Sequence, residues 1–148
     1  MGLVTYIQCD YEACESQKNT LGLLNRDPPE RHQDFKFVFD VDGNTYSGRF
    51  PKLIHSGALI FKMTIFTEFF TKWLKPYVHY IPVSPDYSDL EAQVQWAIEN
   101  DEKAREIAQN GRQFALKYMR NEQIECYSEM LFLEMGRLQT GKEMVMKD

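Results

Sequence analysis

The stretch that decides the fold is KFVFDVDGNTYSGRF, residues 36–50, followed closely by SGALIFK, residues 56–62. The first six residues are mostly apolar, β-branched or aromatic, which is typical of a buried strand. Turn-forming residues follow, and the pattern then favours a short helix at about 49–55 and a second strand at 58–63. A strand-helix-strand unit this short is expected to be parallel and right-handed. The sequence therefore predicts an α/β fold with a short parallel sheet.

The loop between the first strand and the helix suits a phosphate group. Gly48 lets the backbone approach a ligand closely, and Arg49 presents a planar cation that can bind two phosphate oxygens. A helix that starts near Arg49 would also point its free N–H groups at the same anion. The alternative is an ordinary turn with a surface arginine. The local pattern leaves both open, because Gly-x4-Gly-Arg is not an established nucleotide-binding fingerprint.

The whole chain reads as one compact lobe with a segment on either side. Residues 1–34 are polar, irregular and rich in turns, with one or two helical turns expected at 11–18. The lobe spans 35–139, and 140–148 form a loose polar tail.

Further elements are expected between the second strand and the C-terminus. A short helix at about 66–74 precedes a third strand at 77–83, which is bracketed by prolines. Ser88 and Glu91 form a capping box before the first of three C-terminal helices. Each helix has one apolar face: Leu90, Val94, Ala97 and Ile98 in the first; Ala104, Ile107, Ala108, Gly111, Phe114, Ala115 and Tyr118 in the second, which begins near Asp101; Ile124, Tyr127, Leu131, Met135 and Leu138 in the third, which begins near Asn121.

Composition and charge argue against several classes of protein. The 148 residues, 43% of them hydrophobic, fit one domain with a real core. A net charge of −5 argues against nucleic acid as a partner, since surfaces that track phosphates need clustered Lys and Arg. No segment has the roughly 18 uninterrupted apolar residues of a membrane span, and the first residues do not resemble a secretory signal. Cys9, Cys14 and Cys126 form no convincing zinc motif, and the sequence leaves their pairing open.

Three motifs, DVDGNTYSGRF (40–50), LKPYVHYIPV (74–83) and YSDL (87–90), occur in the order and spacing of a known family. Together they resemble the C-terminal part of the family-90 glycosyltransferases, the capsule-associated, Rumi-like and KDEL-motif-containing enzymes of lipopolysaccharide-modifying type. The resemblance runs from about Phe35 to Leu138 and is closest to fungal members. It implies transfer of glucose or xylose from a UDP-sugar to a hydroxyl of a glycoprotein or polysaccharide acceptor.

The resemblance also implies a GT-B architecture, in which two Rossmann-like lobes enclose the active site. This chain matches the C-terminal, donor-binding lobe and is expected to be a truncated piece of the enzyme, with the missing N-terminal lobe as its partner. The family's catalytic base is an aspartate of that N-terminal half, so no catalytic residue is assigned here. Alone, the piece is expected to bind a UDP-sugar weakly without transferring it. Family members work in the lumen of the endoplasmic reticulum or Golgi, although this chain shows no entry or retention signal.

The family's donor site maps onto the loop of the opening stretch. Arg49 is expected to neutralise the diphosphate of the leaving UDP, where negative charge grows as the glycosidic bond forms. Ser47 either donates to a phosphate or satisfies its own turn. The resemblance implies no cofactor and no metal, and we interpret Asp40 and Asp42, despite their metal-like spacing, as turn-forming residues. The donor-binding residues of this loop are Asn44, Thr45, Tyr46, Ser47, Gly48 and Arg49.

Three further residues are candidates with open alternatives. Glu68 either holds the ribose hydroxyls from a helix below the site or is a solvated or capping glutamate. Lys62, at the end of the second strand, either faces the phosphates or extends its ammonium group to solvent. His79 belongs to the residue type that titrates near neutrality, as a general base must, but its apolar neighbours favour a half-buried structural histidine.

Two other classes of function stay open. The chain could be a binding or regulatory module that has lost catalysis, or a general α/β interaction domain whose resemblance is only ancestral. Binding of UDP-glucose or UDP-xylose without turnover would favour the first class. An Arg49→Ala variant that binds nucleotide as well as the parent chain would favour the second.

Overall fold

The structure, a computed structural model, describes residues 10–21 and 34–140 of the chain. The chain divides into two compact units, residues 1–31 and 32–148. Most of the expected irregular N-terminal segment lies outside the described residues, and so does the expected tail apart from its first residue.

The first unit contains the helix α1 (Tyr11–Leu21), which continues beyond the helical turns expected at 11–18. The Asp10 carboxylate accepts the Ala13 N–H at 2.8 Å and so caps the start of the helix. Cys14 within α1 is disulfide-bonded.

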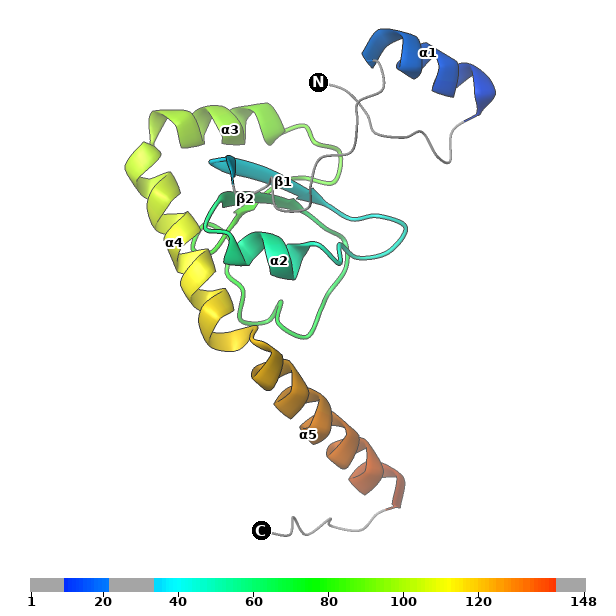
Figure 1. Cartoon of the computed structure of the whole chain (residues 1–148), viewed down its shortest axis with the longest axis vertical. Helices are drawn as coiled ribbons and strands as arrows, with labels where there is room; N and C mark the ends of the chain where they lie inside the picture. The colour runs from blue at the N-terminus through cyan, green and yellow to red at the C-terminus, as the bar shows by residue number, and fades with distance from the viewer. Residues whose placement is uncertain (1–9, 22–33, 141–148) are drawn as a thin grey trace. The chain divides into compact units, whose positions relative to one another are not determined.

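The second unit is built on a three-stranded parallel sheet in the order β1-β2-β3. β1 (Phe37–Val41) pairs with β2 (Leu59–Met63) along its whole length, and β2 pairs with the short strand β3 (Ile81–Pro82). Helix α2 (Phe50–His55) connects β1 to β2 and packs against both strands (Figure 1). The predicted α/β fold with a parallel strand-helix-strand unit is therefore confirmed.

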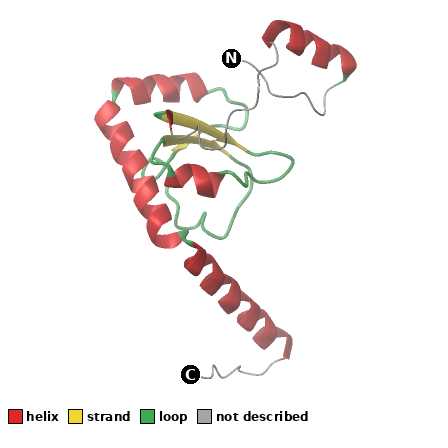
Figure 2. Cartoon of the chain, viewed as in Figure 1, coloured by secondary structure: helices red, strands yellow, loops and turns green. Residues whose placement is uncertain are grey.

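Three helices follow the sheet: α3 (Leu90–Glu99), α4 (Asp101–Tyr118) and α5 (Asn121–Thr140) (Figure 2). α4 contacts α2, β2 and α3. Its predicted apolar stripe is buried from Ala104 to Ala115, whereas Tyr118 at the end of the helix is exposed. Gly111 brings α4 close to the chain beneath it, because a Cβ atom there would collide with the carbonyl oxygen of His79.

Strand β2 lies at the centre of the core, since all of its side chains are buried. Ile60 packs in one cluster with side chains of α2 and α4, while Leu59 and Phe61 pack in a second cluster with side chains of α3 and α4. Each buried side chain of this size contributes roughly 1.5–3 kcal/mol. A parallel strand covered on both faces is normally apolar throughout, so the buried Lys62 within β2 needs a specific partner.

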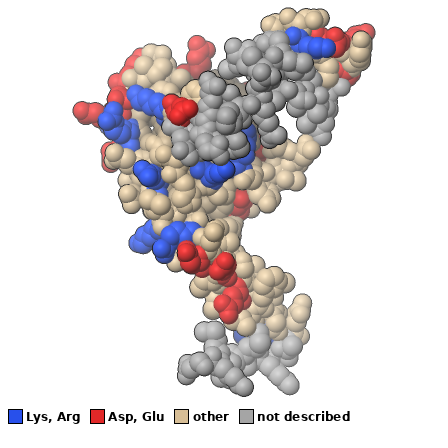
Figure 3. Space-filling model, in the orientation of Figure 1, with Lys and Arg blue, Asp and Glu red and all other residues tan. Residues whose placement is uncertain are grey.

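The inward face predicted for α5 is wrong. Tyr127 stacks on Phe69 with ring centroids 4.7 Å apart, but Ile124 is only half-buried and the other members of the face, Leu131, Met135 and Leu138, are exposed. Figure 3 shows much of the visible described surface of α5 without charged side chains. An amphipathic pattern predicts that a face will be covered, but not by which partner.

The apolar face predicted for α3 is only partly buried. The face is buried at Ala97, half-buried at Leu90 and Val94, and exposed at Ile98.

None of the helices within residues 10–21 and 34–140 combines the length and the hydropathy that a bilayer span requires.

Two predictions for the segment after β2 are wrong. No helix forms at 66–74, and residues 69–73 make turns instead. The Thr71 N–H donates to the Glu68 carbonyl oxygen and the Trp73 N–H to the Phe70 carbonyl oxygen, both at 3.0 Å, so these bonds span three residues, as in turns, and not the four of an α-helix. The third strand is shorter than expected, because Tyr77 has φ 57° in the left-handed region and interrupts the extended backbone.

The predicted capping box is also wrong. α3 begins at Leu90 with Asp89 in the N-cap position, and the N-cap residue makes no side-chain cap bond. Ser88 lies one residue earlier, where its hydroxyl donates to Asp86 at 2.8 Å. The Ser88 hydroxyl therefore bonds to the Asp86 carboxylate instead of capping the helix, and Ser88 and Glu91 form no capping box.

Candidate functional site

The candidate site lies where the parallel strands end. The chain leaves this edge of the sheet at 42–49 after β1, at 64–80 after β2 and at 83–89 after β3. Ligands of α/β proteins bind outside the carboxyl ends of parallel strands. The candidate residues Asn44 to Arg49 all belong to the first of these loops, and Glu68 belongs to the second.

Asp40, in β1, connects several of the candidate residues. Its side chain is 0% exposed, and its carboxylate accepts the Ser47 hydroxyl at 2.5 Å and the Lys62 ammonium group at 3.0 Å. The Arg49 guanidinium lies 3.7 Å from the same carboxylate. The turn-forming interpretation of Asp40 is therefore wrong. A carboxylate inside an apolar strand was the signal, because a buried charge requires a partner and β2 supplies a cation.

Ser47 is buried, and its contact with Asp40 ties the loop to β1. Its carbonyl oxygen also accepts the Phe50 N–H at 3.2 Å, which links the loop to the start of α2. The serine thus holds the shape of the loop through both its side chain and its backbone.

Arg49 is exposed, and the backbone of β1 orients it. Its Nη2 atom donates to the carbonyl oxygen of Val41 at 3.2 Å and is also the atom nearest to Asp40. Both contacts found in the described part of the chain use this one nitrogen, so Nε and Nη1 remain for a ligand. The side chain is 63% exposed and can meet an anion without a structural change.

Three of the positions at the start of α2 offer no free N–H group. The Phe50 N–H donates to Ser47, Pro51 has no N–H, and the Lys52 N–H donates to the Arg49 carbonyl oxygen at 3.0 Å. These contacts use the donors that a helix start would otherwise offer to an anion. An anion at this loop would therefore meet mainly the guanidinium of Arg49.

The rest of the loop faces solvent. Asn44, Thr45, Tyr46 and Gly48 are all exposed. A Cβ atom built at Gly48 would meet no atom within 4 Å, so open space lies beside this backbone. The loop is thus accessible along its length, apart from the anchoring serine.

Lys62 lies beneath the loop rather than at its surface. Its side chain is only 5% exposed, and its ammonium group lies 4.1 Å from the centroid of the Phe50 ring. Paired with Asp40, it holds the carboxylate that in turn contacts Ser47 and Arg49. The ammonium group of Lys62 therefore does not extend to solvent, as one alternative expected, but pairs with the Asp40 carboxylate.

Glu68 lies in a turn and is half-buried. Burial raises the pKa of its carboxyl group; the charge of Lys62 lowers it, and Asp40 and Asp42 raise it further. Charges from both β1 and β2 thus act on Glu68. Asp42 joins the first two loops directly, because its carboxylate accepts the Ile65 N–H at 2.9 Å.

His79 lies away from this edge, in a turn. Its Nδ1 atom accepts the Lys75 N–H at 2.9 Å, and its ring lies 4.9 Å from the ring of Phe114. Burial lowers the pKa of His79, and the charge of Lys75 lowers it further, so the ring is neutral at neutral pH. These contacts match the structural interpretation of this histidine. Across residues 10–21 and 34–140, no group of three or more His, Cys, Asp or Glu could hold a metal ion.

Comparison with known proteins gives consistent matches. The model of the family described as "Glycosyl transferase family 90" matches residues 7–148. Protein O-glucosyltransferase 2 of Danio rerio is 38% identical over 112 residues, 75% of this chain and 22% of that protein. Protein O-glucosyltransferase 1 of Rattus norvegicus is 37% identical over 129 residues, 85% of this chain and 33% of that protein. The O-glucosyltransferase rumi homolog of Aedes aegypti is 32% identical over 140 residues, 89% of this chain and 35% of that protein.

Proposed function

This chain belongs to glycosyl transferase family 90, and on that premise we propose that it forms the nucleotide-sugar-binding part of a UDP-sugar-dependent glycosyltransferase. The reaction would be transfer of glucose or xylose to a hydroxyl of a protein or glycan. The matched relatives named protein O-glucosyltransferases favour glucose and a protein acceptor. The chain spans only 22% and 33% of the length of these two relatives.

The observation that carries the proposal is the support of Arg49. Its guanidinium is exposed at the carboxyl edge of the sheet, yet a strand carbonyl and a buried carboxylate hold it in place. A preorganised cation stabilises the growing charge of a leaving diphosphate without reorganisation during the reaction. Glu68, in the neighbouring loop, would accept hydrogen bonds from the ribose hydroxyls.

The catalytic base, the acceptor contacts and the second lobe belong to the proposed remainder of the enzyme. The exposed apolar face of α5, with Met135 46% exposed and Leu138 69% exposed, supports a partner surface of this kind. We further propose that the reaction needs no metal, since Arg49 provides the charge at the diphosphate, and that the complete enzyme works in the secretory pathway lumen.

A second candidate is a nucleotide-sugar-binding or protein-interaction module without catalysis. The exposed apolar side chains of Leu131, Met135 and Leu138 in α5 support it, since they suit a surface that binds a protein partner. Turnover separates the two candidates: hydrolysis or transfer of the sugar by this chain together with the remaining lobe supports the transferase, and binding without turnover supports the module.

The proposed donor site is tested by isothermal titration calorimetry of the full chain with UDP, UDP-glucose and UDP-xylose, with uridine as the control that lacks phosphate. We expect UDP to bind at least about tenfold more tightly than uridine, because charge-assisted contacts dominate the site. An absence of both heat and thermal shift with UDP would overturn the proposal.

A further inference from the structure

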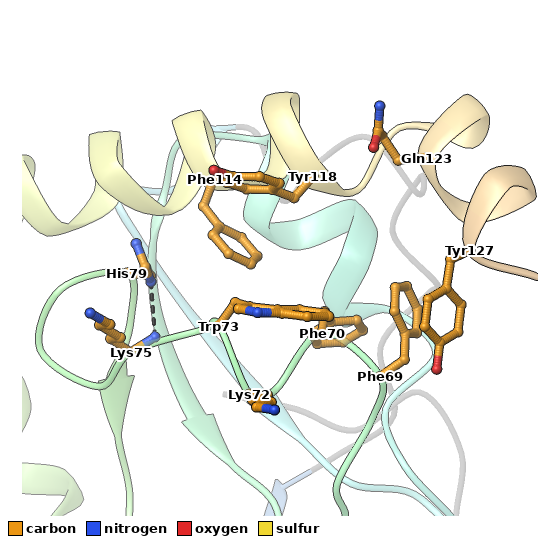
Figure 4. Close-up of a pocket in the computed structure, with 10 residues that line it drawn as sticks. All are labelled: Phe69, Phe70, Lys72, Trp73, Lys75, His79, Phe114, Tyr118, Gln123 and Tyr127. Atoms are coloured by element: carbon orange, nitrogen blue, oxygen red, sulfur yellow. Dashed lines mark hydrogen bonds between the residues drawn. The ribbon is translucent and has the colours of Figure 1, made fainter. Parts of the chain in front are cut away.

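A second region of this unit has the features of a ligand site. A cavity of about 620 Å³ lies between the turns that follow β2, the C-terminal half of α4 and the first turns of α5 (Figure 4). Its volume falls within the range of small-molecule pockets, roughly 300–1,000 Å³. The cavity contains none of the donor-loop residues 42–49. Most of its wall is aromatic: Phe69, Phe70, Trp73, Phe114, Tyr118 and Tyr127.

Some rings of the aromatic wall are packed against the core, and others are exposed. Phe70 stacks on Phe50 of the core, and Phe69 packs edge-on against Phe70, with centroids 5.7 and 5.1 Å apart. Trp73 and Tyr118, in contrast, are 53% and 48% exposed and line the cavity. Tyr118 packs on the buried Phe114 with ring centroids 5.3 Å apart, so the exposed rings of Trp73 and Tyr118 offer a surface for a flat apolar body.

The polar groups of the cavity favour a negative charge. Lys72 and Lys75 line it, and no carboxylate is among its lining residues. His79 adds a donor, because its Nδ1 atom accepts the Lys75 N–H, which places the hydrogen of the neutral ring on Nε2. Lysine ammonium groups bind carboxylates by charge-assisted hydrogen bonds.

We propose that this cavity binds a small amphipathic anion, with a flat aromatic body against Trp73 and Tyr118 and a carboxylate near Lys72 and Lys75. The site is separate from the proposed donor loop and does not depend on nucleotide binding.

The test uses 2-naphthoate as the probe and 2-naphthylmethanol as its neutral counterpart, titrated into the full chain by calorimetry. We expect the acid to bind at least about tenfold more tightly than the alcohol. The chain has two tryptophans, so the indole N–H resonances in a nitrogen-correlated NMR spectrum report the location. Trp96→Phe assigns them, and the Trp73 resonance is expected to shift while that of Trp96 stays in place.

Matched lysine variants test the charge. Lys72→Gln and Lys75→Gln together should reduce the preference for the acid over the alcohol to less than about threefold, and Lys103→Gln, outside this cavity, should leave it unchanged. Exposed lysines can be replaced without unfolding the chain, which circular dichroism checks. Equal binding of acid and alcohol, an unchanged preference in the double variant, or tighter binding of the neutral sugar methyl β-glucoside would each overturn the proposal. Titration with UDP tests the donor loop and not this cavity, so the two proposals can fail independently.

Discussion

The carboxylate of Asp40 and the ammonium group of Lys62 lie 3.0 Å apart, on residues that are register partners in β1 and β2. Both side chains are buried, and the same carboxylate also accepts the Ser47 hydroxyl. An ion pair inside the sheet thus supports the loop that carries Arg49. The position of the Arg49 guanidinium thus depends on Asp40 and Lys62, which are buried and need not contact a ligand.

Breaking this pair should strongly destabilise the fold. Asp40→Asn leaves the Lys62 charge buried without a counter-charge, and we expect a loss of about 3–5 kcal/mol in the free energy of unfolding. The double variant Asp40→Asn, Lys62→Met should lose clearly less than the sum of the two single variants. Urea denaturation measures both. Lys36→Gln, which removes an exposed ion pair with Asp101, is the control and should leave the midpoint nearly unchanged.

Replacement of Arg49 should affect binding rather than folding. Arg49→Ala removes the cation proposed to meet the diphosphate, and we expect the affinity for UDP to fall roughly 10- to 100-fold. Arg49→Lys should recover part of the loss, because an ammonium group keeps the charge but not the planar fork. The melting temperature should stay close to that of the parent chain. Lys52→Ala, an exposed cation in α2, is the matched control, and an equal effect of both variants would contradict the role of Arg49.

Glu68 can be tested with a ligand that lacks its proposed partners. Glu68→Ala should weaken UDP binding about tenfold, the effect expected for hydrogen bonds to a charged group. The same substitution should hardly change the affinity for 2′,3′-dideoxyuridine diphosphate, which has no ribose hydroxyls. Calorimetry measures the affinities of UDP and of the dideoxy analogue for the parent chain and for Glu68→Ala. An equal loss for the two ligands would show that Glu68 acts through the structure of the site instead.

His79 should make the stability depend on pH. Its pKa is lowered in the folded chain from the ordinary value of 6.5, so the unfolded chain takes up a proton first as the pH falls. We therefore expect the free energy of unfolding to decrease as the pH falls from about 6.5 through the lowered pKa. His79→Asn keeps an acceptor for the Lys75 N–H and should flatten this part of the profile. Parallel profiles for the two proteins would refute the assignment.

Gly111 should tolerate no side chain. Gly111→Ala places a Cβ atom against the His79 carbonyl oxygen, so α4 must shift, and we expect a loss of about 1–3 kcal/mol despite the better helix propensity of alanine. Gly43→Ala is the matched control, since a Cβ atom there meets nothing within 4 Å. Thermal unfolding of both variants measures the difference.

The parts of the fold that follow from neighbouring residues were predictable. The strand-turn-helix of the opening stretch and the apolar stripe of α4 depend on periodicity within a few residues, and both are confirmed. The expected helix at 66–74 is wrong, because the backbone hydrogen bonds of Thr71 and Trp73 span three residues and close turns instead of continuing an α-helix. The face of α5 was recognised as apolar, but its lack of a cover within the described residues could not be read from its pattern.

The sequence by itself determined the class of fold, the order of its elements apart from the helix expected at 66–74 and, through the order of its motifs, the family. These properties depend on local periodicity, turn residues and short motifs. Only the tertiary structure decided how the site is built. Asp40 meets Lys62 across 22 residues of chain because the strands pair in one register, and the same carboxylate accepts the hydroxyl of the buried Ser47. A contact between distant residues depends on packing that no local pattern encodes.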